Sequence, residues 1–120
     1  MQQIEKQYEE FVTEFGKKLG KVDVSFALQT MYLQRKIPDS LPKVELQVCY
    51  KPGTDLEQKR VELDNYFACI STTYFRKQNG APDCENTLGV ECLTDLDTVY
   101  KISLDSDIIS IHGKASLGSY

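Results

Sequence analysis

The sequence predicts a single α+β domain, spanning residues 1–120, in which helices cover one face of a mostly antiparallel sheet. The chain has 120 residues, a length that one hydrophobic core can serve. Apolar residues recur every three or four positions in two stretches and alternate in several others, which indicates helices and strands respectively. We therefore expect an N-terminal helix, a two-strand segment, a second helix and C-terminal antiparallel strands.

The first stretch has the pattern of an amphipathic helix. Its apolar residues lie three or four positions apart, as on one face of a helix; they are Ile4, Tyr8, Phe11, Phe15 and Leu19. Lys17 and Lys18 fall in the last turn, where cations suit the helix dipole. Gly20 follows at the position that favours a left-handed residue. The pattern predicts a helix that ends near residue 19.

In the next stretch apolar and polar residues alternate, and this pattern predicts two strands. In residues 21–35, apolar side chains occupy every second position from Val22 to Leu28, as in a half-buried strand. Residues 37–42 contain two prolines, which favour a loop. Val44, Leu46 and Val48 then alternate with polar residues. The connection is too short for a helical crossover, so we expect the two strands to pair antiparallel.

A capping box predicts the start of the second helix. Lys51-Pro52-Gly53 is typical of a turn, and Thr54-Asp55-Leu56-Glu57 matches the capping box. An apolar stripe favours one long helix from Asp55 to about Gln78. The alternative is a shorter helix that ends near Asp64-Asn65, because residues 66–76 are rich in the aromatic and β-branched side chains of strands.

The C-terminal part is expected to form a meander. Residues 79–83 have loop composition. Residues 88–93, 99–104 and 108–112 are strand candidates, with Asp95-Leu96-Asp97 and Asp105-Ser106-Asp107 as the hairpin turns between them. Residues 113–120 show no clear period.

The cysteines predict no metal site. Cys49, Cys69, Cys84 and Cys92 form no Cys-x-x-Cys pair, and the chain has one histidine, whereas structural zinc needs four closely grouped ligands. No secretory leader is recognised at the start, so we expect a cytoplasmic protein whose Cys49 and Cys69 pack as small apolar side chains. A Cys84–Cys92 disulfide is the alternative in an oxidising compartment.

The net charge is −4, and this acidity disfavours nucleic acid as a partner. No apolar run approaches the length of a membrane helix. Seven acidic residues follow Pro82, among them Asp95, Asp97, Asp105 and Asp107. These four are candidate binding residues for a basic protein surface; their other interpretation is turn chemistry. They lack the glycine and terminal glutamate of a calcium loop.

The sequence contains no phosphate loop, nucleophile elbow or zinc-protease motif. We therefore expect no cofactor and a non-enzymatic protein-binding or regulatory module, of adaptor, chaperone or inhibitor type, that forms a homodimer. The alternative is a small-ligand-binding protein or enzyme with a pocket between sheet and helix. His112 would then be the acid–base group, oriented by Asp107 or Asp95.

Overall fold

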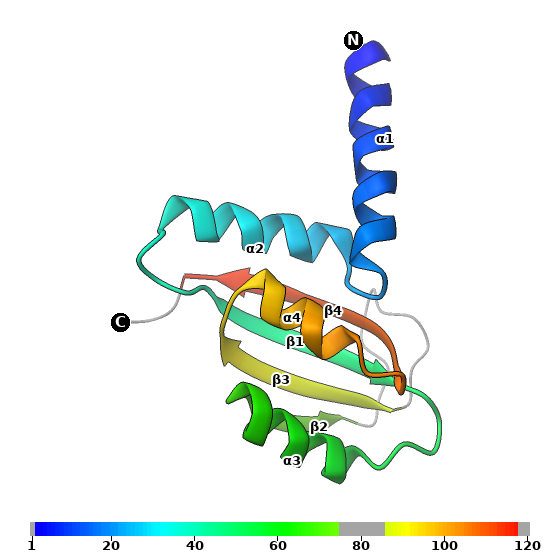
Figure 1. Ribbon diagram of the computed structural model, residues 1–120, viewed down its shortest axis with the longest axis vertical. Coiled ribbons are helices and arrows are strands. Elements are labelled where there is room, and N and C mark those ends of the chain that lie inside the picture. The colour runs from blue at the N-terminus through cyan, green and yellow to red at the C-terminus, as the bar shows by residue number, and fades with distance from the viewer. Residues whose placement is uncertain (1, 75–85, 118–120) are drawn as a thin grey trace.

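The structure is a computed structural model that describes residues 2–74 and 86–117 (Figure 1). It contains helices α1 (Gln2–Leu19), α2 (Val24–Lys36), α3 (Leu56–Phe67) and α4 (Leu96–Ser103) and strands β1 (Lys43–Tyr50), β2 (Ile70–Tyr74), β3 (Thr87–Leu93) and β4 (Ile108–Ser116). The predicted α+β class is confirmed. The loop predicted over residues 79–83, Cys84 and the last three residues lie outside the described ranges.

The four strands form one antiparallel sheet in the order β2-β3-β1-β4. The chain passes from β1 through α3 to β2, and from β3 through α4 to β4. This succession is a split β-α-β, or ferredoxin-like, arrangement. Helices α2, α3 and α4 lie against the sheet, whereas α1 extends away from it (Figure 1).

The core lies between the sheet and these helices. Val44, Leu46 and Val48 of β1 are buried and pair in register with buried residues of β3, and Val44 and Val48 also pair with buried residues of β4. The alternate residues of β1, from Lys43 to Gln47, are partly exposed on the other face of the sheet. The inner face is also the one on which Phe26 and Ala27 of α2 and Val99 and Ile102 of α4 contribute to the same apolar cluster.

The strand predicted over residues 21–35 is wrong, because this stretch forms α2. Asp23 caps the helix, and its side chain accepts from the amide of Phe26 at 3.0 Å. Only the segment before the cap pairs with the sheet: the amide of Ile111 donates to Lys21 O and that of Asp23 to Ile111 O, each at 2.9 Å. The burial does not follow the alternation of the sequence, because Phe26, Ala27 and Thr30 are buried together, as the helical period requires.

The long helix from Asp55 to Gln78 is also wrong. The predicted helix start near Asp55 is confirmed, but Asp55 rather than Thr54 is the cap: its side chain accepts from the amide of Gln58 at 3.2 Å, whereas the Thr54 hydroxyl donates to Lys51 O. The helix stops at Phe67, because Ala68 adopts a left-handed conformation with φ of 53°. Residues 70–74 then form β2, so the alternative strand interpretation is correct here. Pairing with β3 outweighs continuation of the helical stripe.

In the C-terminal part, the strands predicted at 88–93 and 108–112 are confirmed, and β4 continues to Ser116. The strand predicted at 99–104 is wrong, since residues 96–103 form α4. Asp95 caps this helix and residues 105–107 connect it to β4, so neither acidic pair forms a hairpin turn. Val99 and Ile102 are three residues apart and both buried in the same cluster, which fits one face of a helix, whereas in a strand they would point to opposite faces.

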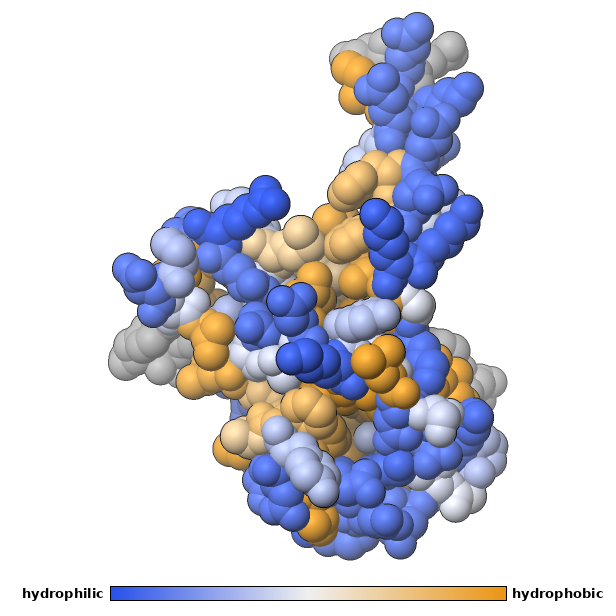
Figure 2. Space-filling view, viewed as in Figure 1, coloured by the Kyte–Doolittle hydropathy of each residue, from blue (hydrophilic) through white to orange (hydrophobic). Residues whose placement is uncertain are grey.

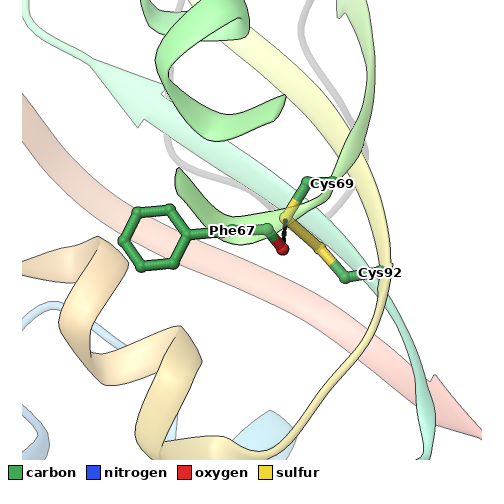
Figure 3. Close-up of a disulfide and its surroundings, with 3 residues drawn as sticks. All are labelled: Phe67, Cys69 and Cys92. Carbon is green, nitrogen blue, oxygen red and sulfur yellow. Dashed lines mark hydrogen bonds between the residues drawn. A yellow bond between two sulfur atoms is a disulfide. The ribbon is translucent and has the colours of Figure 1, made fainter. Parts of the chain in front are cut away.

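A disulfide fastens the end of α3 to the sheet (Figure 3). Cys69 bonds to Cys92 of β3, with the Cα atoms 4.9 Å apart, a separation that suits a disulfide. Cys49 is also disulfide-bonded, and no described cysteine is free. The expectation that Cys49 and Cys69 are free is therefore wrong. The partner of Cys92 is Cys69 rather than Cys84, because β2 brings Cys69 beside the end of β3.

Candidate functional site

Helix α1 carries a stripe of apolar side chains that extends beyond the core. We call Ile4, Tyr8, Phe11 and Phe15 the α1 stripe. The exposed fractions of Ile4, Tyr8 and Phe11 are 65%, 60% and 52%. Phe15 packs partly against the core, and the ring of Phe11 stacks on it with 5.6 Å between centroids. The stripe is thus anchored at its inner end and open to solvent along its outer three positions.

The stripe forms one wall of an open notch between α1 and α2. The two helices meet where Gly16 lies against Val24, because a Cβ on Gly16 would come within 3.3 Å of Val24 Cγ2. Figure 2 shows apolar side chains on the side of α1 that faces α2 and hydrophilic ones on its opposite side. Tyr32, further along α2, is 61% exposed. We call this region the α1–α2 notch.

The base of the notch is fixed to the sheet. Gly20 makes the turn after α1 with φ of +63°, a conformation that glycine adopts without strain. Lys21 and Asp23 then share backbone hydrogen bonds with Ile111, and Lys21 Nζ donates to Asp105 O at 2.9 Å. Further along α2, Gln29 accepts from the amide of Ala115 at 3.0 Å. These contacts hold the start of α2, and with it the foot of α1, on the edge of β4.

The charges of α1 are separated along its axis. Residues 2–14 contain four acidic residues and one lysine, which gives −3, whereas residues 15–19 contain Lys17 and Lys18 and no acidic residue, which gives +2. Both lysines are exposed. Acidic residues near the helix start and lysines near its end also suit the helix dipole. The helix therefore presents an acidic outer part and a basic foot beside one apolar stripe.

A second feature is a cavity of about 210 Å³ between α3, α4 and the ends of β1 and β4. Its lining combines apolar and charged side chains, including Leu63, Phe67, Lys59, Glu62 and Asp105. Lys59 Nζ lies 2.8 Å from Asp105 Oδ2 and 2.9 Å from Asp107 Oδ2. Three of the charged side chains at this cavity, Lys59, Glu62 and Asp105, are thus paired with one another within the chain.

Burial and hydrogen bonding shift the pKa values of Lys59 and Asp105 in opposite directions. Burial alone would lower the pKa of Lys59, but the hydrogen bonds to Asp105 and Asp107 outweigh it and hold that pKa above its usual value. Burial likewise works to raise the pKa of Asp105, yet the bond from Lys59 lowers it overall. Burial raises the pKa of the neighbouring Tyr50 hydroxyl. All three groups therefore keep their ordinary charge states at neutral pH.

The four acidic residues predicted to bind a partner do not form one patch. Asp105 and Asp107 pair with Lys59. Asp95 accepts from the amide of Thr98 at 2.9 Å as the cap of α4, and this bond is the main reason that its pKa is lowered. Asp97 is exposed in the first turn of α4. Among the described residues, no group of three His, Cys, Asp or Glu side chains is placed to hold a metal ion.

The structure does not bring the predicted acid–base pair together. His112 pairs across the sheet with Gln47, which alternates with the buried Leu46 and Val48. His112 therefore points to the face opposite the helices. Asp107 precedes β4 and bonds to Lys59 of α3. The cavity between α3 and α4 lies on the helix side of the sheet, away from His112.

The residues of the α1 stripe were identified from the sequence, but as the apolar face of a helix expected to cover the sheet. Their spacing of four, three and four positions averages about 3.7 residues, close to the 3.6 residues of one α-helical turn, so they form a straight apolar seam on one helix face that can pack on another element. The reversal of charge along α1 is the second signal of such a seam. Neither signal shows whether the opposing surface belongs to the same chain.

No protein-family model, curated protein or solved structure matches the chain in comparisons with known proteins. In the part of the chain that the structure describes, no helix has the length and apolarity to cross a membrane. The fold and the surface thus define an α+β domain with a protruding amphipathic helix.

Proposed function

We propose that this protein is a non-enzymatic interaction module that self-associates through α1. The observation that carries the proposal is the exposure of Ile4, Tyr8 and Phe11 on one side of a single helix. Burying a large apolar side chain is worth about 1.5–3 kcal/mol. Contiguous apolar surface of this kind marks interaction sites in proteins that are otherwise well packed.

The length of α1 supports the same conclusion. The helix has 18 residues and is therefore about 27 Å long. Only its last turns reach the core, through Phe15 and Leu19. Most helical stability in proteins comes from packing of an apolar face. A second surface on the α1 stripe supplies that packing for the outer turns.

We assign the proposed partner surface to α1 instead of the four acidic residues. Asp95, Asp105 and Asp107 make contacts within the chain, which leaves Asp97, exposed in the first turn of α4, as the one of the four without such a contact among the described residues. A basic protein partner for the acidic segment remains a prediction without support from this geometry. The ligand-binding alternative depends on His112 as its acid–base group. This alternative is not supported, because His112 faces away from the cavity.

The disulfide bonds are an argument about the cellular compartment of the protein. Disulfides persist in oxidising compartments and are rare in the cytosol. Cys69 and Cys92 are 0% and 5% exposed, and their bond joins the connection between α3 and β2 to β3. This supports an oxidising compartment over the cytoplasm that the sequence predicts.

Sedimentation equilibrium tests the proposal. We expect the unmodified chain to show the mass of a dimer as its concentration rises. Replacing Tyr8 and Phe11 by serine shifts the equilibrium to monomer. The matched control is Tyr66→Ser, because Tyr66 is 78% exposed on α3 and lies away from the notch; this variant stays dimeric. A monomer at every concentration of the unmodified chain contradicts the proposal.

A further inference from the structure

The cavity between α3 and α4 has an apolar interior. Its lining comes from α3, α4, the ends of β1 and β4 and the turn before β4, and no described residue of α1 contributes to it. Four of the lining side chains are at most 5% exposed; they are Tyr50, Leu63, Ile102 and Ile108. The cavity is therefore a feature of the folded domain, separate from the α1 stripe.

The volume of the cavity suits one aromatic ring with a short substituent. The volume is about 210 Å³, whereas a cavity of about 150 Å³ is enough to hold benzene. Tyr50, Tyr66 and Phe67 are part of the lining, and aromatic rings pack favourably on one another. A phenyl group thus fits the apolar interior and leaves room for a polar group at the opening.

Two charged side chains of the lining are satisfied within the chain. Lys59 Nζ lies within hydrogen-bond distance of both Asp105 and Asp107, at 2.8 and 2.9 Å. The side chains of Lys59 and Asp105 are 14% and 28% exposed. Because each already has a close partner of opposite charge, a ligand gains little from either group.

The other two charged side chains, Glu62 and Lys101, are free to bind a ligand. Glu62 Oε2 is 3.8 Å from Lys59 Nζ, which is too long for a hydrogen bond. Lys101 forms no ion pair and no side-chain hydrogen bond with the residues that the structure describes, and it acts on Asp95 only through a longer-range Coulomb interaction. Glu62 belongs to α3 and Lys101 to α4, so the two helical walls carry opposite available charges.

From these observations we infer that the cavity binds a free amino acid with an aromatic side chain. Its ammonium group pairs with Glu62, its carboxylate pairs with Lys101, and its ring lies on the apolar interior. Such a molecule carries both charges beside one apolar group, which is the combination that the lining leaves unsatisfied. Hydrogen bonds between ionised groups are stronger than neutral ones. The site contains no histidine, and it does not depend on self-association through α1.

Nuclear magnetic resonance of the nitrogen-15-labelled chain tests the site with three matched probes at neutral pH. They are L-phenylalanine, phenethylamine, which lacks the carboxylate, and hydrocinnamate, which lacks the ammonium group. We expect L-phenylalanine to shift the amide signals of Leu63 and Ile102 to saturation and to leave those of α1 unchanged. The other two probes lose one charged contact each and should bind at least about tenfold more weakly.

Two variants assign the charged contacts. Glu62→Gln should weaken the binding of L-phenylalanine and phenethylamine but not that of hydrocinnamate, because only the first two carry an ammonium group. Lys101→Met should weaken the binding of L-phenylalanine and hydrocinnamate but not that of phenethylamine. The matched controls should leave all three affinities unchanged. They are Glu57→Gln, on α3 but outside the lining, and Lys114→Met, which removes a lysine that pairs with Glu45 of β1.

Three results would overturn the inference. One is the absence of a saturable shift at Leu63 and Ile102 up to the solubility limit of L-phenylalanine. Another is binding of phenethylamine or hydrocinnamate as tight as that of L-phenylalanine, because one of the two charged contacts would then contribute nothing. The third is an unchanged affinity for L-phenylalanine in Glu62→Gln or Lys101→Met. A monomer in sedimentation contradicts the proposed function but leaves this site unaffected.

Discussion

Lys59 of α3 lies 2.8 Å from Asp105 Oδ2 and joins that helix to the connection between α4 and β4. The side chains of Lys59 and Asp105 are 14% and 28% exposed. Asp105 also accepts from the amide of Asp107 at 2.9 Å. One carboxylate therefore orders the turn into β4 and fixes the middle of α3 above it.

Replacing Lys59 by methionine should lower the free energy of unfolding by about 1.5–3 kcal/mol, the range for a hydrogen bond to a charged group. The variant leaves Asp105 and Asp107 without their cation. The control is Lys17→Met, because Lys17 and Glu14 are 70% and 68% exposed in their pair and such pairs contribute little. Urea unfolding measures both. If the two variants lost equal amounts of unfolding free energy, the stabilising role of the Lys59–Asp105 pair would be contradicted.

Acidification should weaken the fold through Asp105. The pKa of this group in the folded chain lies below its usual 3.8, so its contribution to stability is fully present above pH 3.8. The contribution is lost as the pH falls through the lowered pKa. The raised pKa of Lys59 acts in the opposite direction and keeps its contribution until the pH exceeds 10.5. We expect a shallower acid dependence of unfolding in Lys59→Met; an unchanged dependence would count against the pair.

Asp95 and Asp97 should differ in their effect on stability. Asp95→Ala removes the cap of α4 and should cost about 1 kcal/mol. Asp97 lies in the same turn but is exposed, so Asp97→Ala should cost less than about 0.5 kcal/mol. Thermal unfolding of the two variants measures the difference. A larger loss for Asp97 would refute the assignment of the cap.

The Cys69–Cys92 bond should be a major contribution to stability. It closes a loop with a sequence separation of 23, for which chain entropy gives about 3 kcal/mol. The double variant Cys69→Ala, Cys92→Ala should lose about that amount in guanidinium unfolding. Added reductant should destabilise the unmodified chain more than this variant. If reductant affects both equally, the stabilisation resides elsewhere.

The sequence was sufficient for the fold class and for the elements with two agreeing signals. The start of α3 has both a capping box and a stripe, and α1 has a stripe, basic last residues and Gly20. For the stretch after Val22, the alternation of apolar and polar residues was the single signal of a strand. Its first residues do pair with Ile111 of β4, so the strand pattern was real but lasted only until the cap at Asp23.

The errors elsewhere come from contacts between distant residues. The composition of residues 66–76 allowed a strand, but the pairing with β3 that decides for a strand at residues 70–74 is encoded by no local pattern. The disulfide partner of Cys92 depends on the same pairing. The surface role of the α1 stripe depends on where α2 departs, and periodicity shows only that a helix face is apolar.

Amide hydrogen exchange at low and high protein concentration tests the central claim most directly. The account predicts that the amides of residues 4–15 become more protected as concentration rises, whereas those of α3 do not change. Protection of α1 that is the same at both concentrations would contradict self-association through this helix.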